Sequence, residues 1–364
     1  MAKIMVAMSG GVDSSLVTAL LHEQGHAVTG VTMHLWEGDD EGIYESQCCS
    51  QEMVAGARRV CAQLDVPYYV FNYQREFRRH VIEYFLSEYA HGYTPNPCLA
   101  CNRDLKFRFL LERAQALGFD YLATGHYAQI RKPDGQPYEL WRGVDHAKDQ
   151  SYVLYMLQQH ELARLQFPLG GMSKAEVRAL ARERLLATAD RPESQDICFI
   201  PDNDYRRFLR EEAPESMLPG PIIDHDGQVV GQHKGLPYYT VGQRKGLGIT
   251  SPQPLFVTEL DTERNALIVG PAEAATRHIF TIEQAKFGNG TWPDVPFTCQ
   301  VQIRAHATPV EATITPCGEQ RLQVTFSKPQ RAITPGQAGV LYDGNRLLGG
   351  GRIARSQPAE NSDL

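Results

Sequence analysis

A double glycine between an apolar run and a helical pattern constrains this chain more than any other stretch. Residues 4–8 (I-M-V-A-M) predict a short buried strand, and apolar residues at helical spacing after Val12 predict a helix. Between them lies S-G-G-V-D-S at residues 9–14. Glycines let a backbone approach a phosphate closely, and the N–H groups at a helix N-terminus attract anions. This order of strand, glycines and helix predicts a phosphate-binding loop.

Two further features of the loop bear on its chemistry. Ser9 and Ser14 add hydroxyl donors, and the Asp13 carboxylate is a candidate ligand for a Mg²⁺ that bridges phosphates. The alternative is a plain glycine turn in which Ser9 or Asp13 caps the helix. The loop is not of the Walker type, because no G-K-[S/T] follows. It resembles the PP-loop of ATP pyrophosphatases, S-G-G-x-D-S, and this resemblance implies adenylation of a substrate.

Length and composition set wider limits. A chain of 364 residues is long for one domain, and 42% apolar with 22% charged residues is ordinary for a globular protein. No apolar run approaches the roughly 20 residues of a membrane span, and residues 1–8 look like a first strand rather than a signal peptide, so a soluble, cytoplasmic protein without membrane contact is expected. The net charge of −7 gives no global attraction to nucleic acid, so such a partner requires a local basic face.

The first half of the chain alternates strand and helix patterns. Predicted strands at 4–8, 28–34, 67–72 and 121–124 are separated by helical segments, which indicates a doubly wound, mostly parallel sheet. Ligands of such sheets bind beyond the carboxyl ends of the strands. Ser9, Met33 and Gly125 follow three of these ends, so one crevice is expected to collect them around ATP, with Met33 either against the adenine or in the core.

After about residue 205 the pattern changes. Residues 255–269 predict a hairpin, and short strands at 298–304, 310–314, 322–326 and 339–342, separated by Pro, Gly and Asn, predict a small antiparallel barrel. The predicted fold class is α/β. It comprises an N-terminal Rossmann-like PP-loop domain at 1–205, a small central domain at 206–275, a C-terminal antiparallel β-barrel at 276–356 and a disordered tail at 357–364.

Eight cysteines in a chain of this kind suggest reactive or metal-binding thiols more than structural disulfides. Cys98 and Cys101 lie in T-P-N-P-C-L-A-C-N just before a predicted helix, whose N-terminus would lower the pKa of a thiol. No second C-x-x-C follows at zinc-ribbon spacing, which favours reactive thiols over a structural zinc. Apolar neighbours predict a buried, inert Cys198. Core positions are predicted for Cys61, Cys299 and Cys317, and Cys48 and Cys49 stay unassigned.

Seven motifs occur in a fixed order along the chain. They are S-G-G-V-D-S, T-P-N-P-x-x-x-C-N, A-T-G-H-Y at 123–127, K-D-Q-S-Y at 148–152, I-C-F-I around Cys198, G-Q-R-K-G-L-G at 242–248 and T-P-G-Q at 334–337. Together they resemble the tRNA-specific 2-thiouridylase family, bacterial enzymes that place sulfur on the wobble uridine of tRNA. The resemblance covers nearly the whole chain.

The resemblance implies a role for each motif. The ATP-binding residues would be Ala7, Met8, Ser9, Gly10, Gly11, Val12, Asp13, Ser14, Met33 and Gly125. Cys198 would carry sulfur as a persulfide, and Cys101 would resolve it through a Cys101–Cys198 disulfide. The tRNA-binding residues would be Asn96, Pro97 and Cys98 at the target base, with His126, Lys148, Asp149, Gln150, Arg304, Ala305 and Gln337 elsewhere. The central domain would also contact tRNA.

The implied reaction uses ATP and Mg²⁺. Adenylation turns the C2 oxygen of uridine into a good leaving group as pyrophosphate departs, and persulfide sulfur then replaces that oxygen as AMP leaves. Expected partners are wobble-uridine tRNAs, such as those for Lys, Glu and Gln, and a cysteine desulfurase or sulfur-relay protein as the donor. Local basic clusters at 75–79, 103–108 and 206–210 offer phosphate contacts despite the negative net charge.

Departures from the family pattern leave more than one mechanism open. Many members have an aspartate where this chain has Cys98, and Ala305 and His306 stand where an aromatic often follows the arginine. Cys98, Cys101 and Cys198 would also suit an Fe–S cluster with one open iron site, which would bind sulfide in place of a persulfide. The sequence also allows a PP-loop synthetase for a small molecule, and an RNA-binding or metal-storage protein with a vestigial nucleotide loop.

Overall fold

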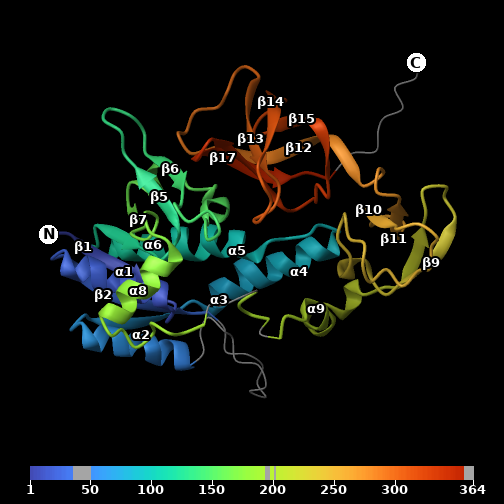
Figure 1. Cartoon of the computed structure of the whole chain (residues 1–364). Helices are drawn as coiled ribbons and strands as arrows, with labels where there is room; N and C mark the ends of the chain where they lie inside the picture. The colour runs from blue at the N-terminus through green and yellow to red at the C-terminus, as the bar shows by residue number, and fades with distance from the viewer. Residues whose placement is uncertain (36–50, 193–196, 201, 356–364) are drawn as a thin grey trace.

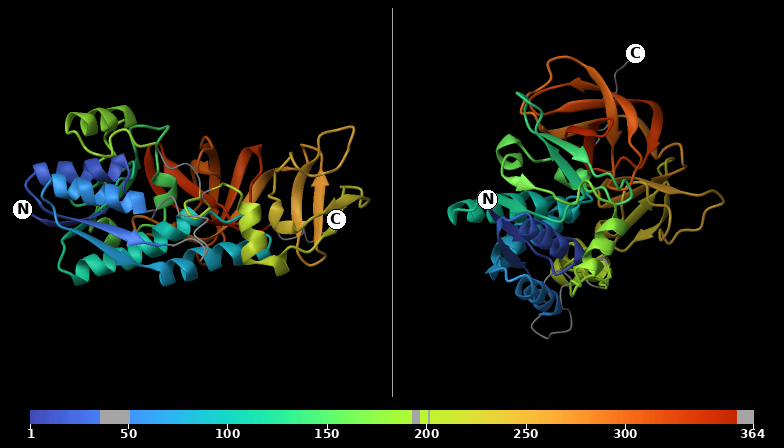
Figure 2. Two further views of the ribbon diagram at one scale, coloured as in Figure 1. Left: turned by 90° about the horizontal axis from the view of Figure 1, so that it is seen from below. Right: turned by 60° about the vertical axis from the view of Figure 1, so that its left-hand side comes forward.

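The computed structural model describes residues 1–35, 51–192, 197–200 and 202–355. Three sheets organise this part of the chain (Figure 1). The parallel sheet and the small central sheet lie at opposite ends of an elongated molecule, and the barrel lies between and above them (Figure 2). In the described ranges, no helix has the length and apolar character needed to cross a membrane.

The N-terminal sheet confirms the predicted doubly wound class. Its five strands, all parallel, stand in the order β3-β2-β1-β4-β7. They are β1 (Lys3–Ala7), β2 (Ala27–His34), β3 (Tyr68–Asn72), β4 (Tyr121–Ala123) and β7 (Leu165–Gln166). The first four match the predicted strands within two residues. The strand β7 was not predicted, because a two-residue strand carries no apolar run.

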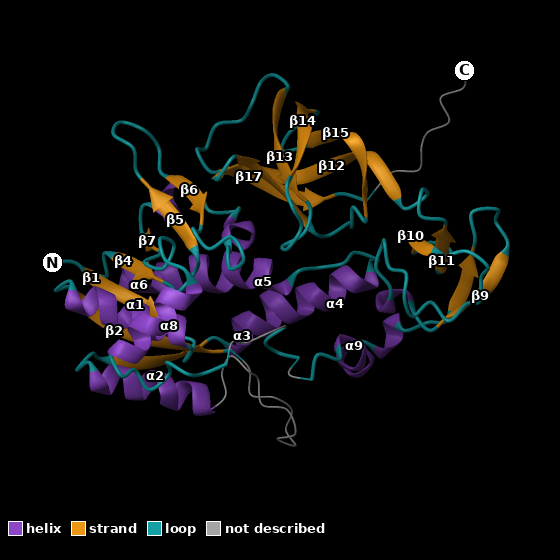
Figure 3. Cartoon of the chain, viewed as in Figure 1, coloured by secondary structure: helices purple, strands orange, loops and turns teal. Residues whose placement is uncertain are grey.

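Helices cover this sheet (Figure 3). They include α1 (Val12–Glu23), α2 (Gln51–Gln63) and α8 (Lys174–Glu183). Helix α8 begins with a capping box: the Glu176 N–H donates to the Ser173 hydroxyl at 3.3 Å, and the Ser173 N–H donates to the Glu176 carboxylate at 2.7 Å. Cys48 and Cys49 lie outside the described residues.

Two long helical rods cross the middle of the molecule. The first runs through α3 (Gln74–Phe77), η1 (Arg78–Ile82) and α4 (Glu83–Ala90), and the second through α5 (Pro97–Ala100), η2 (Cys101–Leu110) and α6 (Leu111–Ala116). Gly118, at φ +77°, follows the second rod, in the left-handed conformation that commonly ends a helix. The segments η1 and η2 are π-helical, a departure that frequently accompanies functional sites.

The C-terminal sheet confirms the antiparallel barrel. It contains β12 (Thr276–Phe287), β13 (Phe297–Gln302), β14 (Val310–Pro316), β15 (Leu322–Arg331), β16 (Ala338–Asp343) and β17 (Arg346–Ile353), closed by pairing of β12 with β17. Neither closing strand was predicted. The three consecutive glycines of β17 are more typical of a loop than of a strand. They are needed because β12 lies so close: a Cβ on Gly349 would lie 2.1 Å from the Lys286 carbonyl oxygen of β12.

A hairpin from the first half of the chain extends this barrel sheet. Strands β5 (Ala128–Arg131) and β6 (Glu139–Arg142) pair with each other, and β6 pairs with β17 through Trp141–Arg346 and Leu140–Leu347. The short elements η3 (Ser151–Leu154) and α7 (Gln159–Leu162) follow. The sheet of the barrel therefore includes strands from both halves of the chain, which the sequence pattern did not reveal.

The central region is built on the predicted hairpin. Strands β10 (Phe256–Asp261) and β11 (Ala266–Gly270) pair antiparallel and continue into β8 (Gly220–Ile223) and β9 (Val229–His233). The remaining elements are α9 (Tyr205–Glu212), η4 (Pro214–Ser216) and η5 (Leu236–Tyr238). Ile222, Val257 and Leu267 are fully buried in a core of its own.

Candidate active site

The glycine loop joins β1 to α1, as predicted. Gly10 has φ +77°, and a Cβ at this position would lie 2.3 Å from the Met53 carbonyl oxygen, so only glycine fits. The N-cap of α1 is Gly11, without a side-chain cap. The plain capped turn, with Ser9 or Asp13 as the cap, is therefore wrong. The Ser14 hydroxyl instead accepts the Ser9 N–H at 3.2 Å and donates to the Gly11 carbonyl at 3.2 Å.

The three predicted strand ends come together. Strand β1 lies between β2 and β4, so the loop at 9–14 is flanked by the residues that follow both neighbours. A Cβ on Gly125 would lie 3.0 Å from the Asp13 Cβ and 3.1 Å from the Ser14 nitrogen. Met33, at the end of β2, packs against two apolar clusters. This edge of the sheet is a topological switch point, where ligands of such folds bind.

Sequence patterns missed the partners of Asp13. The Lys174 ammonium, on the first turn of α8, donates to both carboxylate oxygens at 2.7 Å, and the Tyr127 hydroxyl donates to Oδ1 at 2.7 Å. Lys174 is only 9% exposed. Asp13 and Lys174 are 161 residues apart in the chain, and no local signal connects residues at that distance. Asp13 is 32% exposed and a carboxylate has further lone pairs, so its role as a Mg²⁺ ligand stays a prediction.

Arg191 holds the other side of the loop. Its Nη1 donates to the Gly10 carbonyl at 3.0 Å, and its Nη2 donates to the Glu52 carbonyl of α2 at 3.0 Å. A Cβ on Gly56 would lie 2.6 Å from Nη1, so the glycine makes room for the guanidinium. The loop is thus fixed between a lysine on α8 and an arginine from the segment after α8.

Residues 95–101, called the cysteine segment below, form the start of the second helical rod. The Asn96 side chain caps α5 by accepting the Cys98 N–H at 3.0 Å, and Pro97 occupies the first helical position. Cys98 is exposed, and Cys101 lies partly buried where α5 passes into η2. The Asn96 cap and Pro97 fix the start of the helix, and with it the direction in which the side chains of Cys98 and Cys101 point.

Cys198 differs from its prediction. Phe199 and Ile200 are buried, but Cys198 itself is half-buried, so the expected inert core cysteine is wrong. Cys101, Cys198 and Met33 all pack against one apolar cluster, which includes Phe85 and Phe199. The two cysteines and the end of β2 therefore lie around the same core.

The other cysteines divide into buried and exposed. Cys61 and Cys299 are buried, as predicted, and burial raises the pKa of the first thiol to about 11 and of the second to about 12. Cys317 is exposed, so its predicted core position is wrong: it lies in the turn after β14. Among the described cysteines no disulfide is formed.

The cysteines do not form a ready site for a cluster. In the parts of the chain that the structure covers, no three His, Cys, Asp or Glu side chains are grouped as metal ligands. An Fe–S cluster on Cys98, Cys101 and Cys198 requires all three sulfurs around one point. The arrangement present does not fit that group.

The residues expected to contact tRNA differ in exposure. Cys98, Gln150 and Arg304 are exposed, Asn96, Lys148 and Ala305 are partly exposed, and Pro97 is buried. The Asp149 side chain is 4% exposed and holds four groups: it accepts from the Gly143 and Ser151 N–H groups, the Ser151 hydroxyl and the Arg142 guanidinium. In this conformation Asp149 braces the segment at 142–151, and its contact with tRNA stays a prediction.

The predicted basic clusters are partly neutralised within the molecule. Arg78 pairs with Glu212 at 2.7 Å, and Arg103 pairs with Asp104 at 2.7 Å. Arg207 pairs with Asp202 at 2.7 Å and also with Glu211. The Arg78 pair joins η1 to α9, whereas Arg103 and Arg207 pair within their own helix or just before it.

His126 lies in the core beside the glycine loop. It is 7% exposed, its ring lies against Phe107 and Phe167, and Nδ1 is 2.7 Å from the Thr124 hydroxyl. Burial, reinforced by the positive charge of Lys106, holds the pKa of His126 well below 6.5. A direct contact with tRNA requires the side chain to leave this buried position, and the contact stays a prediction.

This burial predicts a pH dependence. Below pH 6.5 the unfolded chain protonates this imidazole and the folded chain does not, so the free energy of unfolding falls as pH falls. The limit from one histidine is about 1.4 kcal/mol per pH unit. In urea unfolding between pH 7.5 and 5.5, the free energy of unfolding of His126→Gln should therefore fall less steeply with falling pH than that of the wild type. His160→Gln, at a side chain 79% exposed, is the matched control and should keep the slope of the wild type. Equal slopes in wild type and His126→Gln would refute the assignment.

Family models match in three consecutive stretches. A model described as tRNA methyl transferase HUP domain matches residues 2–202, one described as tRNA methyl transferase PRC-barrel domain matches 206–271, and one described as aminomethyltransferase beta-barrel domain matches 277–353. The first alone spans more than half of the chain.

Curated relatives match over nearly the full length. The tRNA-specific 2-thiouridylase MnmA of Roseiflexus castenholzii is 64% identical over 370 residues, covering 98% of this chain and 100% of the relative. The protein of the same name from Herpetosiphon aurantiacus is 66% identical over 354 residues, covering 97% and 99%. Among solved structures, a 4-thiouridine synthetase–RNA complex with bound ATP is 16% identical with a TM-score of 0.38, covering 59% of this chain and 51% of that one.

Proposed function

Because the chain belongs to the tRNA-specific 2-thiouridylase family, we propose that it replaces the C2 oxygen of the tRNA wobble uridine with sulfur in an ATP-dependent reaction. It is a tRNA sulfurtransferase. One observation supports the proposed mechanism most. Met33 at the end of β2 and the two cysteines pack against one apolar cluster, and this supports a site in which the sulfur-bearing groups reach the nucleotide.

In the first step the loop at 7–14 holds the phosphates of ATP, with Met33 and Gly125 at the nucleotide. The uridine C2 oxygen attacks the α-phosphorus and pyrophosphate leaves. A carbonyl oxygen is a poor leaving group and an adenylate is a good one, which explains the need for ATP. The backbone N–H groups at the start of α1 face the loop without a side-chain cap and are suited to an anion.

In the second step the terminal sulfur of a Cys198 persulfide attacks C2. The C2–S bond forms as the C2–O bond breaks, and AMP leaves. The Cys101 thiolate then attacks the Cys198 Sγ, and the electron pair of the broken S–S bond stays on the transferred sulfur. Two thiols end as a Cys101–Cys198 disulfide, so a dithiol reductant and a persulfide donor, such as a cysteine desulfurase or relay protein, must restore the enzyme.

The tRNA would lie over the exposed cysteine segment. Asn96, Pro97 and Cys98 would meet the target base, which must leave the anticodon stack to reach them. The rest of the tRNA would contact Lys148, Gln150, Arg304 and Ala305. The proposed domains are 1–205, 206–275 and 276–356. Three apolar clusters that each lie within one of these ranges support this division. A fourth cluster joins the first range to the barrel through Ala338, Val340, Tyr342 and Leu347.

The decisive test is nucleoside mass spectrometry. Unmodified tRNA for Lys or Glu is incubated with the protein, ATP, Mg²⁺ and a persulfide donor, and we expect 2-thiouridine at the wobble position, with AMP and pyrophosphate released in step. The same tRNA with cytidine at the wobble position is the control and should gain no sulfur. ATP consumption that needs no tRNA would favour a small-molecule synthetase, and an iron cluster that tracks activity would favour the cluster route.

A further inference from the structure

Thr94, the residue that precedes the cysteine segment, is held by two distant parts of the chain. Its N–H donates to the Pro335 carbonyl at 2.9 Å, and its carbonyl accepts from Gln337 Nε2 at 2.8 Å. Its hydroxyl lies 3.3 Å from that of Thr240 in the central region. All three polar groups of Thr94 are therefore bound by residues far along the chain, two of them in one loop before β16.

That loop, residues 334–337, meets Thr94 backbone to backbone. Gly336 has φ +92°, and a Cβ there would lie 2.9 Å from the Thr94 nitrogen and 3.1 Å from its carbonyl oxygen. Thr334 is 1% exposed, and its hydroxyl accepts from Arg304 Nη2 at 3.1 Å. The loop is thus braced inside the barrel and fits closely against the start of the cysteine segment.

From Thr94 to Cys101 few torsions are free. Pro95 and Pro97 have fixed φ, and the Asn96 side chain caps α5 at the Cys98 N–H. The helix then continues without a break into η2, which begins at Cys101. A displacement of Thr94 is therefore passed along the segment to both cysteines.

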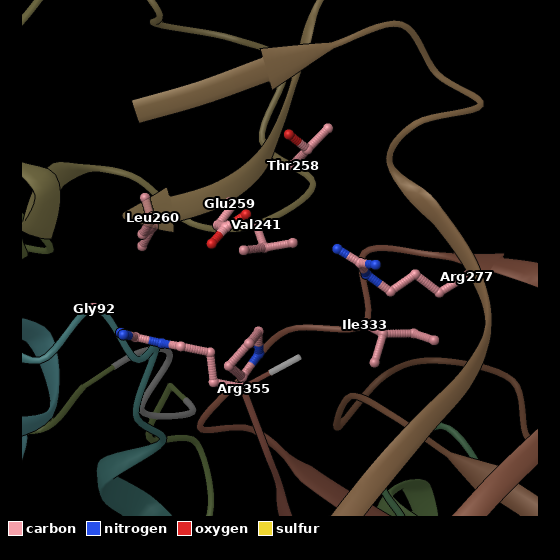
Figure 4. A pocket seen from close by; sticks show the side chains of 9 residues that line it. Gly92, Val241, Thr258, Glu259, Leu260, Arg277, Ile333 and Arg355 are labelled. Atoms are coloured by element: carbon pink, nitrogen blue, oxygen red, sulfur yellow. The ribbon is translucent and has the colours of Figure 1, made fainter. Parts of the chain in front are cut away.

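Beside this junction lies a small, partly open pocket of about 30 Å³, lined among others by Val241, Ile333 and Pro335 (Figure 4). Gly92 and Arg355 border the same space from the other side.

We propose that Gln337 and Gly336 are positioning residues for Cys98 and Cys101. Gln337 acts by holding the Thr94 carbonyl, and the contact with tRNA that the family resemblance implied is not its main role. The barrel then contributes to the active site by fixing the cysteine segment. The effect on turnover rests on the proposed thiolation, but the effect on the thiols themselves does not.

Gln337→Glu tests this, because it keeps the size of the side chain and removes the donor. The first measurement is the rate of Cys101 alkylation by iodoacetamide in the reduced protein without tRNA, read by peptide mass spectrometry. We expect a change of at least about threefold, a turnover reduced about tenfold and a tRNA Kd within about twofold of wild type. Gln330→Glu, at a partly exposed barrel glutamine whose amide donates to the Lys328 carbonyl, is the matched control. Cys317 alkylation is the internal reference in each sample.

Two outcomes would overturn the proposal. If Gln337→Glu leaves the Cys101 alkylation rate unchanged but weakens tRNA binding, Gln337 is a direct tRNA contact. If it changes neither, Gln337 does not position the cysteines. Gly336→Ala, which pushes against the Thr94 backbone, should alter the same alkylation rate and serves if Gln337→Glu does not fold. Failure of thiolation as the function would leave the alkylation result standing.

Discussion

Cys198→Ala is expected to abolish 2-thiouridine formation, by at least about 10³-fold, while tRNA-dependent release of pyrophosphate continues. The first half of the proposed reaction needs only the nucleotide loop and the base, and the second needs a sulfur carrier. Cys101→Ala should lose thiolation to a similar degree, because the S–S bond of the intermediate then has no thiolate to cleave it. Product nucleosides are measured by mass spectrometry and pyrophosphate by a coupled assay.

Cys317→Ala is the matched control for these variants. Cys317 is exposed, like Cys98, but lies in the turn after β14, so its loss should leave both half-reactions unchanged. Cys98→Ala separates the routes: the persulfide mechanism needs only Cys101 and Cys198, and a cluster would need all three. Thiolation that survives in Cys101→Ala or Cys198→Ala would refute the two-cysteine mechanism.

Lys174→Met should lower kcat/KM for ATP by about 100-fold, an effect that arises in the nucleotide loop. The ammonium lies 2.7 Å from both oxygens of Asp13 and is largely buried, so its removal leaves a carboxylate with only the Tyr127 hydroxyl in the place where phosphates would bind. Breaking a buried pair costs about 3–5 kcal/mol of stability, but Asp13 is 32% exposed, so about 1–3 kcal/mol is expected here.

The chain offers a matched control for this pair. Arg184 at the end of α8 pairs with Glu23 at the end of α1, at 2.7 Å, and joins the same two helices in a more exposed place. Arg184→Met should cost at most about 1 kcal/mol and leave kcat/KM for ATP unchanged. Asp13→Asn combined with Lys174→Met completes a double-mutant cycle, and additive losses would show that the pair is not coupled. Equal effects of Lys174→Met and Arg184→Met on ATP would refute a specific role of Lys174.

Local patterns were sufficient for the parallel sheet and most of its helices. The apolar run before Ser9 and the capping box at Ser173 are short-range signals, because each element is specified by residues within a few positions. The prediction missed strands β7 and β17 because they depend on residues far away in the chain. A two-residue strand and a triple-glycine strand exist only because neighbouring strands complete them.

The candidate site was predicted in part. The chain positions of the loop, Met33, Gly125 and the two cysteines came from motifs. The structure places Gly125 against the loop, and Met33 and the two cysteines around one cluster. The Lys174–Asp13 pair and the Gln337–Thr94 bond join residues 161 and 243 positions apart, and a single sequence carries no record of such pairs. The exposure of Cys198 was missed because its neighbours are apolar, although in an irregular segment adjacent residues face different surroundings.

The hairpin β5–β6 has a consequence for synthesis of the protein. Strand β6 is made well before its partner in β17: Glu139 and Arg346, which pair across this joint, are 207 residues apart. At about 5–20 residues per second, the ribosome leaves the edge of β6 without its neighbour for roughly 10–40 s. An open strand edge is a template for aggregation, so we expect nascent chains to be most dependent on chaperones during that interval.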